Sequence, residues 1–178
     1  MNWLTLPLGS RAPEVVNAMI EVPGGQANKY EYDKSLHAVR LDRPLYASVH
    51  YPGDYGFVPS TLADDGDPLD ILVLLPHPTF VGCLIESRPI GVLEMLDQEV
   101  PDQKILGVAV SSPTHKQVHH HTDLEDHVLR EIEHFFAVYK ELEGKHTQTL
   151  GWRSSHEAQQ LIRLCHQRFR EHPAQPDS

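Results

Sequence analysis

The first 110 residues of the chain alternate between short β-rich segments and turns that contain glycine or proline. Six such segments stand out, over residues 15–22, 29–33, 37–42, 69–75, 83–96 and 104–110. Segments of this length and composition are typical of strands that are separated by tight turns. The pattern therefore predicts that the first two thirds of the chain form a sheet.

The hydrophobic period changes in the last third of the chain. In residues 124–140 and again in residues 154–170, apolar residues recur at helical spacing. A capping box of Thr122 and Glu125 predicts the start of the first helix, and Gly144 predicts its end. A second capping box, Ser154 with Glu157, predicts the start of the second helix. This order favours a compact, mostly antiparallel barrel or sheet with two helices packed on it.

Length and charge limit the kinds of protein that this chain can be. A chain of 178 residues suits one domain, and we expect its ends, residues 1–12 and 171–178, to be poorly ordered. The formal net charge of −10 argues against a nucleic-acid partner, because nucleic-acid-binding proteins usually present a basic face. No apolar stretch approaches the roughly 20 residues of a membrane span. Cys83 and Cys165 are typical of reduced thiols, so we expect a cytoplasmic protein without a membrane partner.

An acidic run, DDGDPLD over residues 64–70, directly precedes the apolar run ILVLLP. Crowded carboxylates repel one another and resist burial, so this arrangement costs stability unless a cation lies among them. In an extended chain Asp65 and Asp67 share one face and Asp70 does not, but a bend at residues 66–68 can bring the three together. A solvated acidic turn is the alternative. An EF-hand does not fit, because its required glycine and closing glutamate are missing.

Further polar residues match the needs of phosphate chemistry. They are the carboxylates Glu31, Asp97 and Asp102 and the phosphate donors Lys29, Arg43, Tyr51, Tyr55, Lys104, Tyr139 and Lys140. Each has an ordinary interpretation by itself, such as surface charge or a lysine near a helix C-terminus. Together they offer ligands for several Mg²⁺ ions beside donors for phosphate oxygens. The set predicts metal-assisted phosphoryl transfer to water.

The motif DGDPLD, residues 65–70, resembles the Asp-x-Asp-Pro-x-Asp signature of the soluble family I inorganic pyrophosphatases. The resemblance continues through IEVPGGQANKYEYDK, RPIGVLEMLDQEVPDQKI and HFFAVYK, and it covers about residues 20–140 in consistent order. Agreement across separated motifs is more specific than one short match. The resemblance implies hydrolysis of pyrophosphate to two phosphates by direct attack of a metal-activated water.

The resemblance also implies a role for each matching residue. Asp67 resembles the general base for the attacking water, and Tyr55 a hydrogen-bonding partner beside it. The implied ligands for several Mg²⁺ ions are Asp65, Asp70 and Asp102, joined by Asp97 and Glu31 for the further ions. The implied phosphate clamp consists of Lys29, Arg43, Tyr55, Lys104, Tyr139 and Lys140, with Glu21 and Tyr51 as further polar residues.

The fold implied by the resemblance is a five-stranded OB-like antiparallel β-barrel with flanking C-terminal helices. Members of this type are cytoplasmic homo-oligomers, and the bacterial ones are usually hexamers. This chain departs from the family at Asp54, where asparagine is frequent, and at Gln98, where glutamate commonly follows the aspartate. Both departures leave the affinity for the outermost metal open, and Glu99 is a candidate to compensate.

Several alternatives stay open at this point. A catalytically inactive, divalent-metal-binding relative of this fold would keep the acids. A non-catalytic Ca²⁺ or Mg²⁺ module would not need Lys29, Arg43 or Tyr139, and an OB-type nucleic-acid binder would need a basic groove. The histidine-rich segment, residues 115–121, could bind Zn²⁺ or Ni²⁺. We favour a solvated loop without a catalytic role for it.

Overall fold

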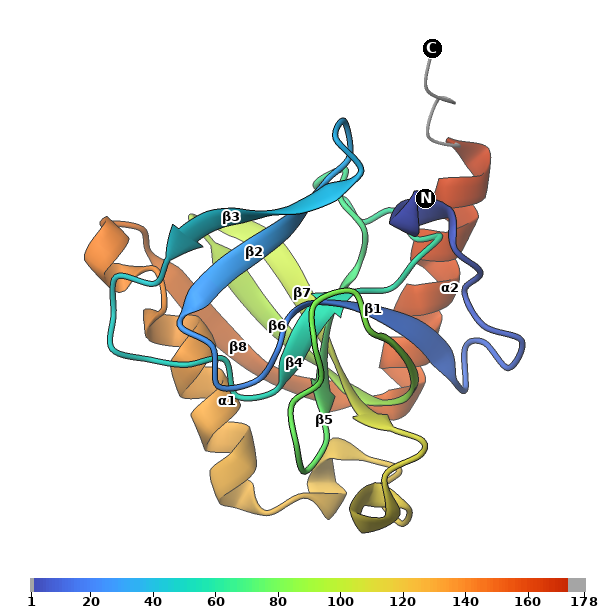
Figure 1. The fold of residues 1–178 in the computed structure, drawn as a ribbon. Coiled ribbons are helices and arrows are strands. Elements are labelled where there is room, and N and C mark those ends of the chain that lie inside the picture. Colours follow the sequence, from blue (N-terminus) through green and yellow to red (C-terminus); the bar gives the residue numbers. More distant parts are fainter. Residues whose placement is uncertain (1, 173–178) are drawn as a thin grey trace.

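The computed structural model describes residues 2–172, and a closed ring of five strands lies at its centre (Figure 1). In order of pairing, the ring consists of β1 (Val16–Val22), β4 (Asp54–Phe57), β5 (Asp70–Leu74), β7 (Val100–Ala109) and β6 (Leu84–Asp97). Strand β6 also pairs with β1, which closes the ring, and β8 (Thr147–Ser154) extends the sheet beside β6. The OB-like five-stranded arrangement that the family resemblance implies is confirmed.

One pairing of the ring is parallel, where the sequence analysis expects antiparallel strands. Strand β5 runs parallel to residues 104–108 of β7, with Asp70 beside Lys104. The chain leaves β5, returns along the 14-residue β6, and reverses again at the turn of Gln98 and Glu99. These two reversals bring β7 back to the direction of β5. The parallel register therefore places two predicted site residues next to each other.

The hairpin of β2 (Asn28–Asp33) and β3 (Ala38–Pro44) forms a separate two-stranded sheet above the ring (Figure 1). The two strands pair antiparallel, and Lys29 lies opposite Arg43. Tyr32 of β2 stacks on Trp3 with 4.8 Å between the ring centroids. Trp3 belongs to the 3₁₀ helix η1 (Trp3–Thr5), where Leu4 is buried. Residues 3–5 are thus packed against the hairpin, in a segment that we expected to be poorly ordered.

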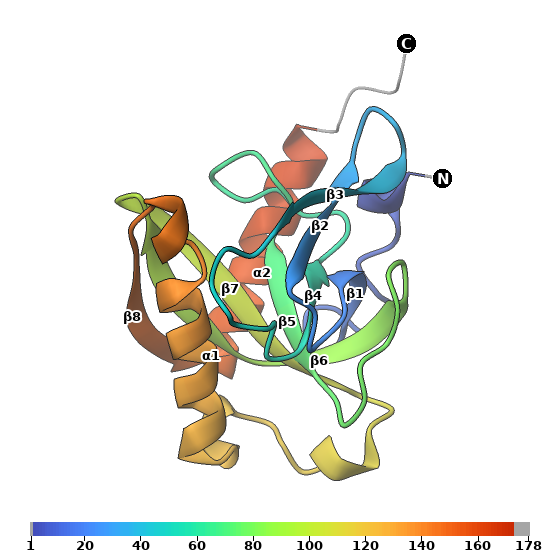
Figure 2. The ribbon, with the colours of Figure 1, turned by 60° about the vertical axis from the view of Figure 1, so that its left-hand side comes forward.

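Two helices cover the ring from different sides (Figures 1 and 2). Helix α1 (Asp126–Val138) adds Ile132, Phe135 and Phe136 to one hydrophobic core, and α2 (Ser155–Glu171) adds Ala158, Ile162 and Cys165 to another. The capping box that starts α2 is confirmed. The expectation for residues 173–178 lies outside the described residues. Within residues 2–172, no helix is long and apolar enough to cross a membrane.

The start and the end predicted for the first helix are wrong. Thr122 lies in a separate 3₁₀ helix, η3 (His121–Asp123), whose Asp123 carboxylate accepts the backbone N–H groups of His119 and His120. Helix α1 therefore begins later, after Glu125, and has no side-chain cap. Gly144, at φ 72°, instead ends the short helix η4 (Glu141–Glu143), because glycine adopts the left-handed conformation without strain.

The sequence analysis missed β4 and β8. Strand β4 has only four residues, and Gly56 lets it lie unusually close to β1, since a Cβ there would be 1.9 Å from the carbonyl oxygen of Met19. In β8, buried and exposed residues alternate only weakly. A register shift interrupts its pairing with β6, and Gly151 there has a positive φ of 105°. Their neighbours in the sheet, more than their own sequences, make these segments strands.

Asp54 is fully buried and ties two loops to β4. Its Oδ1 accepts the backbone N–H of Gly24 at 2.8 Å, and its Oδ2 accepts the backbone N–H of Thr79 at 2.9 Å. The Thr79 hydroxyl also donates to Oδ2. A carboxylate offers two acceptor oxygens, whereas an asparagine amide offers only one. The departure from the family pattern at Asp54 therefore serves the fold.

We expect Asp54→Asn to lower the free energy of unfolding by about 1–3 kcal/mol, because the amide would turn an N–H₂ group toward one of these buried donors. Chemical denaturation followed by fluorescence measures this change. Thr79→Val is the matched control, since it removes only the hydroxyl donor and should cost less. An Asp54→Asn variant as stable as the unsubstituted protein would show that the second acceptor oxygen is not needed here.

Candidate active site

A cavity of about 590 Å³ lies between the ring, the β2–β3 hairpin and the C-terminal end of α1. Eleven of the twelve residues predicted for the site line this cavity: Lys29, Glu31, Tyr55, Asp65, Asp67, Asp70, Asp97, Asp102, Lys104, Tyr139 and Lys140. Glu21 and Tyr51 line it as well. The twelfth residue, Arg43, lies outside the lining. The fold thus brings together side chains from five separate segments of the chain.

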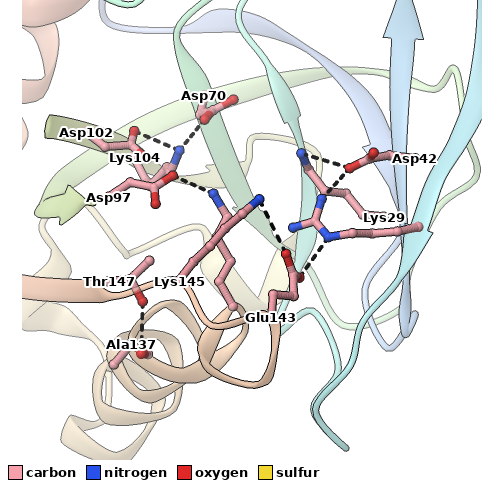
Figure 3. Close-up of polar contacts among 12 residues, drawn as sticks. Lys29, Asp42, Asp70, Asp97, Asp102, Lys104, Ala137, Glu143, Lys145 and Thr147 are labelled. Atoms are coloured by element: carbon pink, nitrogen blue, oxygen red, sulfur yellow. Dashed lines mark hydrogen bonds and ion pairs between the residues drawn. The ribbon is translucent and has the colours of Figure 1, made fainter. Parts of the chain in front are cut away.

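Lys104 is a buried cation that pairs with two carboxylates of the cavity. It is only 5% exposed, and its Nζ pairs with the carboxylates of Asp70 and, at 2.8 Å, of Asp102 (Figure 3). Burial raises the pKa of Asp102, and the charge of Asp70 adds to this effect. Although burial acts the other way, Asp70 and Asp102 raise the pKa of Lys104, so this lysine stays charged. Its charge offsets the repulsion between the two acids.

Each of three further lysines of the cavity pairs with a carboxylate. The pairs are Lys140 with Asp97, Lys29 with Glu31, and Lys34 with Asp67 at 2.6 Å. Lys34 was missed by the sequence analysis, because it follows the predicted strand and has no periodic signal. It lies at the tip of the β2–β3 hairpin, where it joins the hairpin to the acidic turn.

The donor set of the cavity fits Mg²⁺. Within residues 2–172, no three side chains of histidine, cysteine, aspartate or glutamate are already grouped around one cation position. The lining nevertheless offers eight carboxylates, and hard carboxylate oxygens are the ligands that Mg²⁺ prefers. They are Glu21, Glu31, Asp33, Asp65, Asp67, Asp70, Asp97 and Asp102. Oδ1 of Asp97 is buried and has no hydrogen-bond partner in the described part of the chain. An oxygen of this kind is available to a cation.

Three tyrosines, Tyr51, Tyr55 and Tyr139, line the cavity. Burial raises the pKa of Tyr51, Tyr55 and Tyr139 above the ordinary tyrosine value, and the charge of Asp70 acts in the same direction. The hydroxyls therefore remain protonated at neutral pH. The ring of Phe135 in α1 packs against two of them. Its centroid lies 4.8 Å from the ring centroid of Tyr51 and 5.3 Å from that of Tyr139. The tyrosines are fixed hydrogen-bond donors.

Arg43, the predicted residue outside the lining, pairs with two acids that do not line the cavity either. Its Nε donates to Glu143 at 2.7 Å, and its Nη1 pairs with Asp42. Asp42 also lies 3.4 Å from the Nζ of Lys29 (Figure 3). The sequence analysis missed Asp42 and Glu143. No local pattern could have revealed Glu143, because it is 100 residues from Arg43.

The histidine-rich segment, residues 115–121, does not line the cavity. Nδ1 of His120 forms a hydrogen bond with the Ser155 hydroxyl at 2.8 Å. The ring of His121 stacks on that of Trp152, with 5.8 Å between the ring centroids. These contacts attach the segment to β8 and α2.

Glu21 of β1 is half-buried in the cavity wall, and its Oε1 accepts the backbone N–H of Tyr32 at 2.7 Å. Burial raises the pKa of Glu21 to about 8, and the charges of Asp70 and Glu31 contribute. In the metal-free protein, Glu21 therefore keeps its proton at neutral pH, unlike an ordinary glutamate.

This pKa makes stability depend on pH in chelator. Between the unfolded value of 4.5 and the folded value of about 8, the folded state binds a proton that the unfolded state has lost. Stability should therefore decrease as pH rises through this window, by at most about 1.4 kcal/mol per pH unit. Urea denaturation from pH 5 to pH 8.5 measures the slope. Glu21→Gln should flatten it, and an unchanged slope in that variant would contradict the assignment.

The chain is similar in sequence and in structure to known inorganic pyrophosphatases. Residues 18–170 match the family model of inorganic pyrophosphatase. An inorganic pyrophosphatase of Nostoc sp. is 53% identical over 150 residues, which cover 84% of this chain and 89% of that protein. The crystal structure of inorganic pyrophosphatase from Thermus thermophilus has a TM-score of 0.93 and 45% identity, and covers 96% of this chain and 99% of that chain. A pyrophosphatase structure from Helicobacter pylori has a TM-score of 0.88, 35% identity, and coverage of 93% and 98%.

Proposed function

Since this chain belongs to the family of inorganic pyrophosphatases and therefore hydrolyses pyrophosphate to two phosphates, we propose that the cavity described above is its active site. One observation carries this proposal: eleven of the twelve residues implied by the resemblance line one cavity. Carboxylates for metal and cationic or phenolic donors for phosphate occur there together. The complete set does not favour the inactive relative.

We assign the metal ligands from the carboxylates of the cavity. Asp65, Asp70 and Asp102 would hold a principal pair of Mg²⁺ ions, and Asp97 and Glu31 would hold further ions. When bound, Mg²⁺ neutralises part of the substrate charge and lowers the pKa of water.

The remaining residues bind the substrate and move the proton. Asp67 is the proposed general base; its side chain is 65% exposed and lies on the same turn as Asp65, whose Oδ1 accepts the Asp67 N–H at 3.0 Å. Lys29, Lys104 and Lys140 would bind phosphate oxygens, with Arg43 beside them. Tyr55 would donate a hydrogen bond beside Asp67, on the side of the attacking water. Tyr139 would donate to the leaving phosphate, where a hydrogen bond stabilises the charge that develops.

We also propose that the enzyme is a cytoplasmic homo-oligomer, with the hexamer of bacterial members as the expected form. Large apolar side chains that are exposed on the single chain, such as Phe80, Leu142 and Leu150, are available for contacts between copies. Sedimentation velocity measures the state directly, and a monomer at micromolar concentration would contradict it.

A phosphate-release assay tests the proposed function. In Mg²⁺ the enzyme should hydrolyse pyrophosphate much faster than ATP, because the cavity has no glycine-rich loop for a nucleotide. Ca²⁺ should bind the same acids yet support little turnover, since it tolerates irregular geometry and acidifies water less. Comparable rates with ATP and pyrophosphate would contradict the proposed selectivity. No phosphate release from pyrophosphate would instead support the inactive relative.

A further inference from the structure

Arg43 is held by two of its three guanidinium nitrogens. Nε donates to Oε1 of Glu143 at 2.7 Å, and Nη1 pairs with Asp42. The third nitrogen, Nη2, is buried and has no hydrogen-bond partner within residues 2–172. A buried donor without a partner costs free energy unless a ligand uses it. Nη2 is therefore the nitrogen of Arg43 that is available to donate a hydrogen bond to a ligand.

Arg43 lies close enough to the cavity for this use. Asp42, which pairs with its Nη1, also lies 3.4 Å from the Nζ of Lys29, a residue of the cavity lining. The Tyr51 hydroxyl is also buried without a hydrogen-bond partner in the described part of the chain. Two buried donors thus lack a partner, one on a residue of the cavity lining and one on Arg43, the residue opposite Lys29 in the hairpin.

Glu143 connects Arg43 to the other side of the cavity. Its side chain is only 5% exposed and also lies 3.6 Å from the Nζ of Lys145 (Figure 3). Glu143 belongs to η4, which directly follows Tyr139 and Lys140, and its N–H donates to the carbonyl of Lys140 at 3.0 Å. One buried carboxylate thus joins β3 to the segment that carries two residues of the phosphate clamp.

We propose that Glu143 is a positioning residue, which orients Arg43 so that Nη2 meets an oxygen of pyrophosphate. The guanidinium group is planar and rigid, so anchoring Nε and Nη1 fixes the direction of Nη2. Glu143 does not itself line the cavity, so it acts through Arg43. This inference rests on the proposed function of the cavity and adds a residue that the sequence analysis did not single out.

Substitution of Glu143 should weaken substrate binding and leave the chemical step nearly unchanged. Glu143→Gln keeps the shape but loses the charge, and charge-assisted hydrogen bonds are roughly twice as strong as neutral ones. We expect KM for pyrophosphate and Kd for imidodiphosphate, a non-hydrolysable probe, to rise about 10-fold, which corresponds to about 1.4 kcal/mol. The kcat should change much less. Glu141→Gln, on the same turn but exposed, is the matched control and should leave KM unchanged.

A double-mutant cycle separates positioning from a merely structural role. Arg43→Ala should raise KM, and Glu143→Gln should add nothing in the Arg43→Ala background. Glu143→Asp keeps the charge on a shorter arm, should give an intermediate KM, and replaces Glu143→Gln if that variant does not fold.

Two results would overturn the inference. One is a KM that the Glu143 variants leave unchanged although Arg43→Ala raises it; in that case the proposed function stands. The other is a rise in KM that is equal with and without Arg43. If Arg43→Ala itself leaves KM unchanged, the role proposed for Arg43 fails together with the inference.

Discussion

The Asp67→Asn variant is expected to hydrolyse pyrophosphate about 10²–10⁴-fold more slowly than the unsubstituted enzyme, at every Mg²⁺ concentration. The amide keeps the shape of the side chain and still accepts a hydrogen bond, but it cannot take the proton of the attacking water. Stability should change little, because the Asp67 side chain is 65% exposed and its pair with Lys34 lies at the surface.

Asp70→Asn is the matched comparison, since it makes the same chemical change three residues away. Asp70 begins β5 and pairs with the buried Lys104, and we assign it as a direct metal ligand. Its amide removes one negative charge from the ligand set, so the Mg²⁺ concentration for half-maximal rate should rise. Initial rates over a Mg²⁺ titration distinguish the two variants. If Asp67→Asn regained near-normal turnover at high Mg²⁺, Asp67 would be a ligand and the general base would be another group.

The second large effect is on stability. Lys104→Met should lower the free energy of unfolding in chelator by about 3–5 kcal/mol, because it leaves Asp70 and Asp102 facing each other without a cation. Mg²⁺ should restore part of this loss, since it would neutralise the same carboxylates. Urea denaturation with chelator and with millimolar Mg²⁺ measures both quantities.

Lys34→Met provides the control for Lys104→Met. It also removes a lysine from a carboxylate of the cavity, but the Lys34 side chain is 51% exposed. An exposed ion pair contributes only about 0–1 kcal/mol. Equal losses in the two variants would show that the buried Lys104 does not neutralise this partly buried acidic pair. A loss that Mg²⁺ does not reduce would count against Asp70 and Asp102 as metal ligands.

The sequence by itself determined the chemistry of the site. The acidic run at residues 64–70 favours a divalent metal over a solvated turn, because crowded carboxylates repel one another unless a cation lies among them. Ser154 with Glu157 predicts the start of α2, because a capping box depends on residues within one turn. The strand-first order predicts a barrel or sheet with two helices packed on it, and agreement across separated motifs indicates the family, whose likeness implies the five-stranded ring. These inferences depend on residue types and on short spacings, which a sequence displays directly.

The tertiary structure decided which charges meet. The parallel pairing of β5 with β7 puts Lys104 between Asp70 and Asp102. The packing of η4 against β3 joins Glu143 to Arg43 across 100 residues. Such pairs depend on strand register and on how separate elements pack, and neither leaves a periodic pattern in the chain. For the same reason the short, glycine-containing β4 escaped prediction, since its neighbours in the sheet hold it in place.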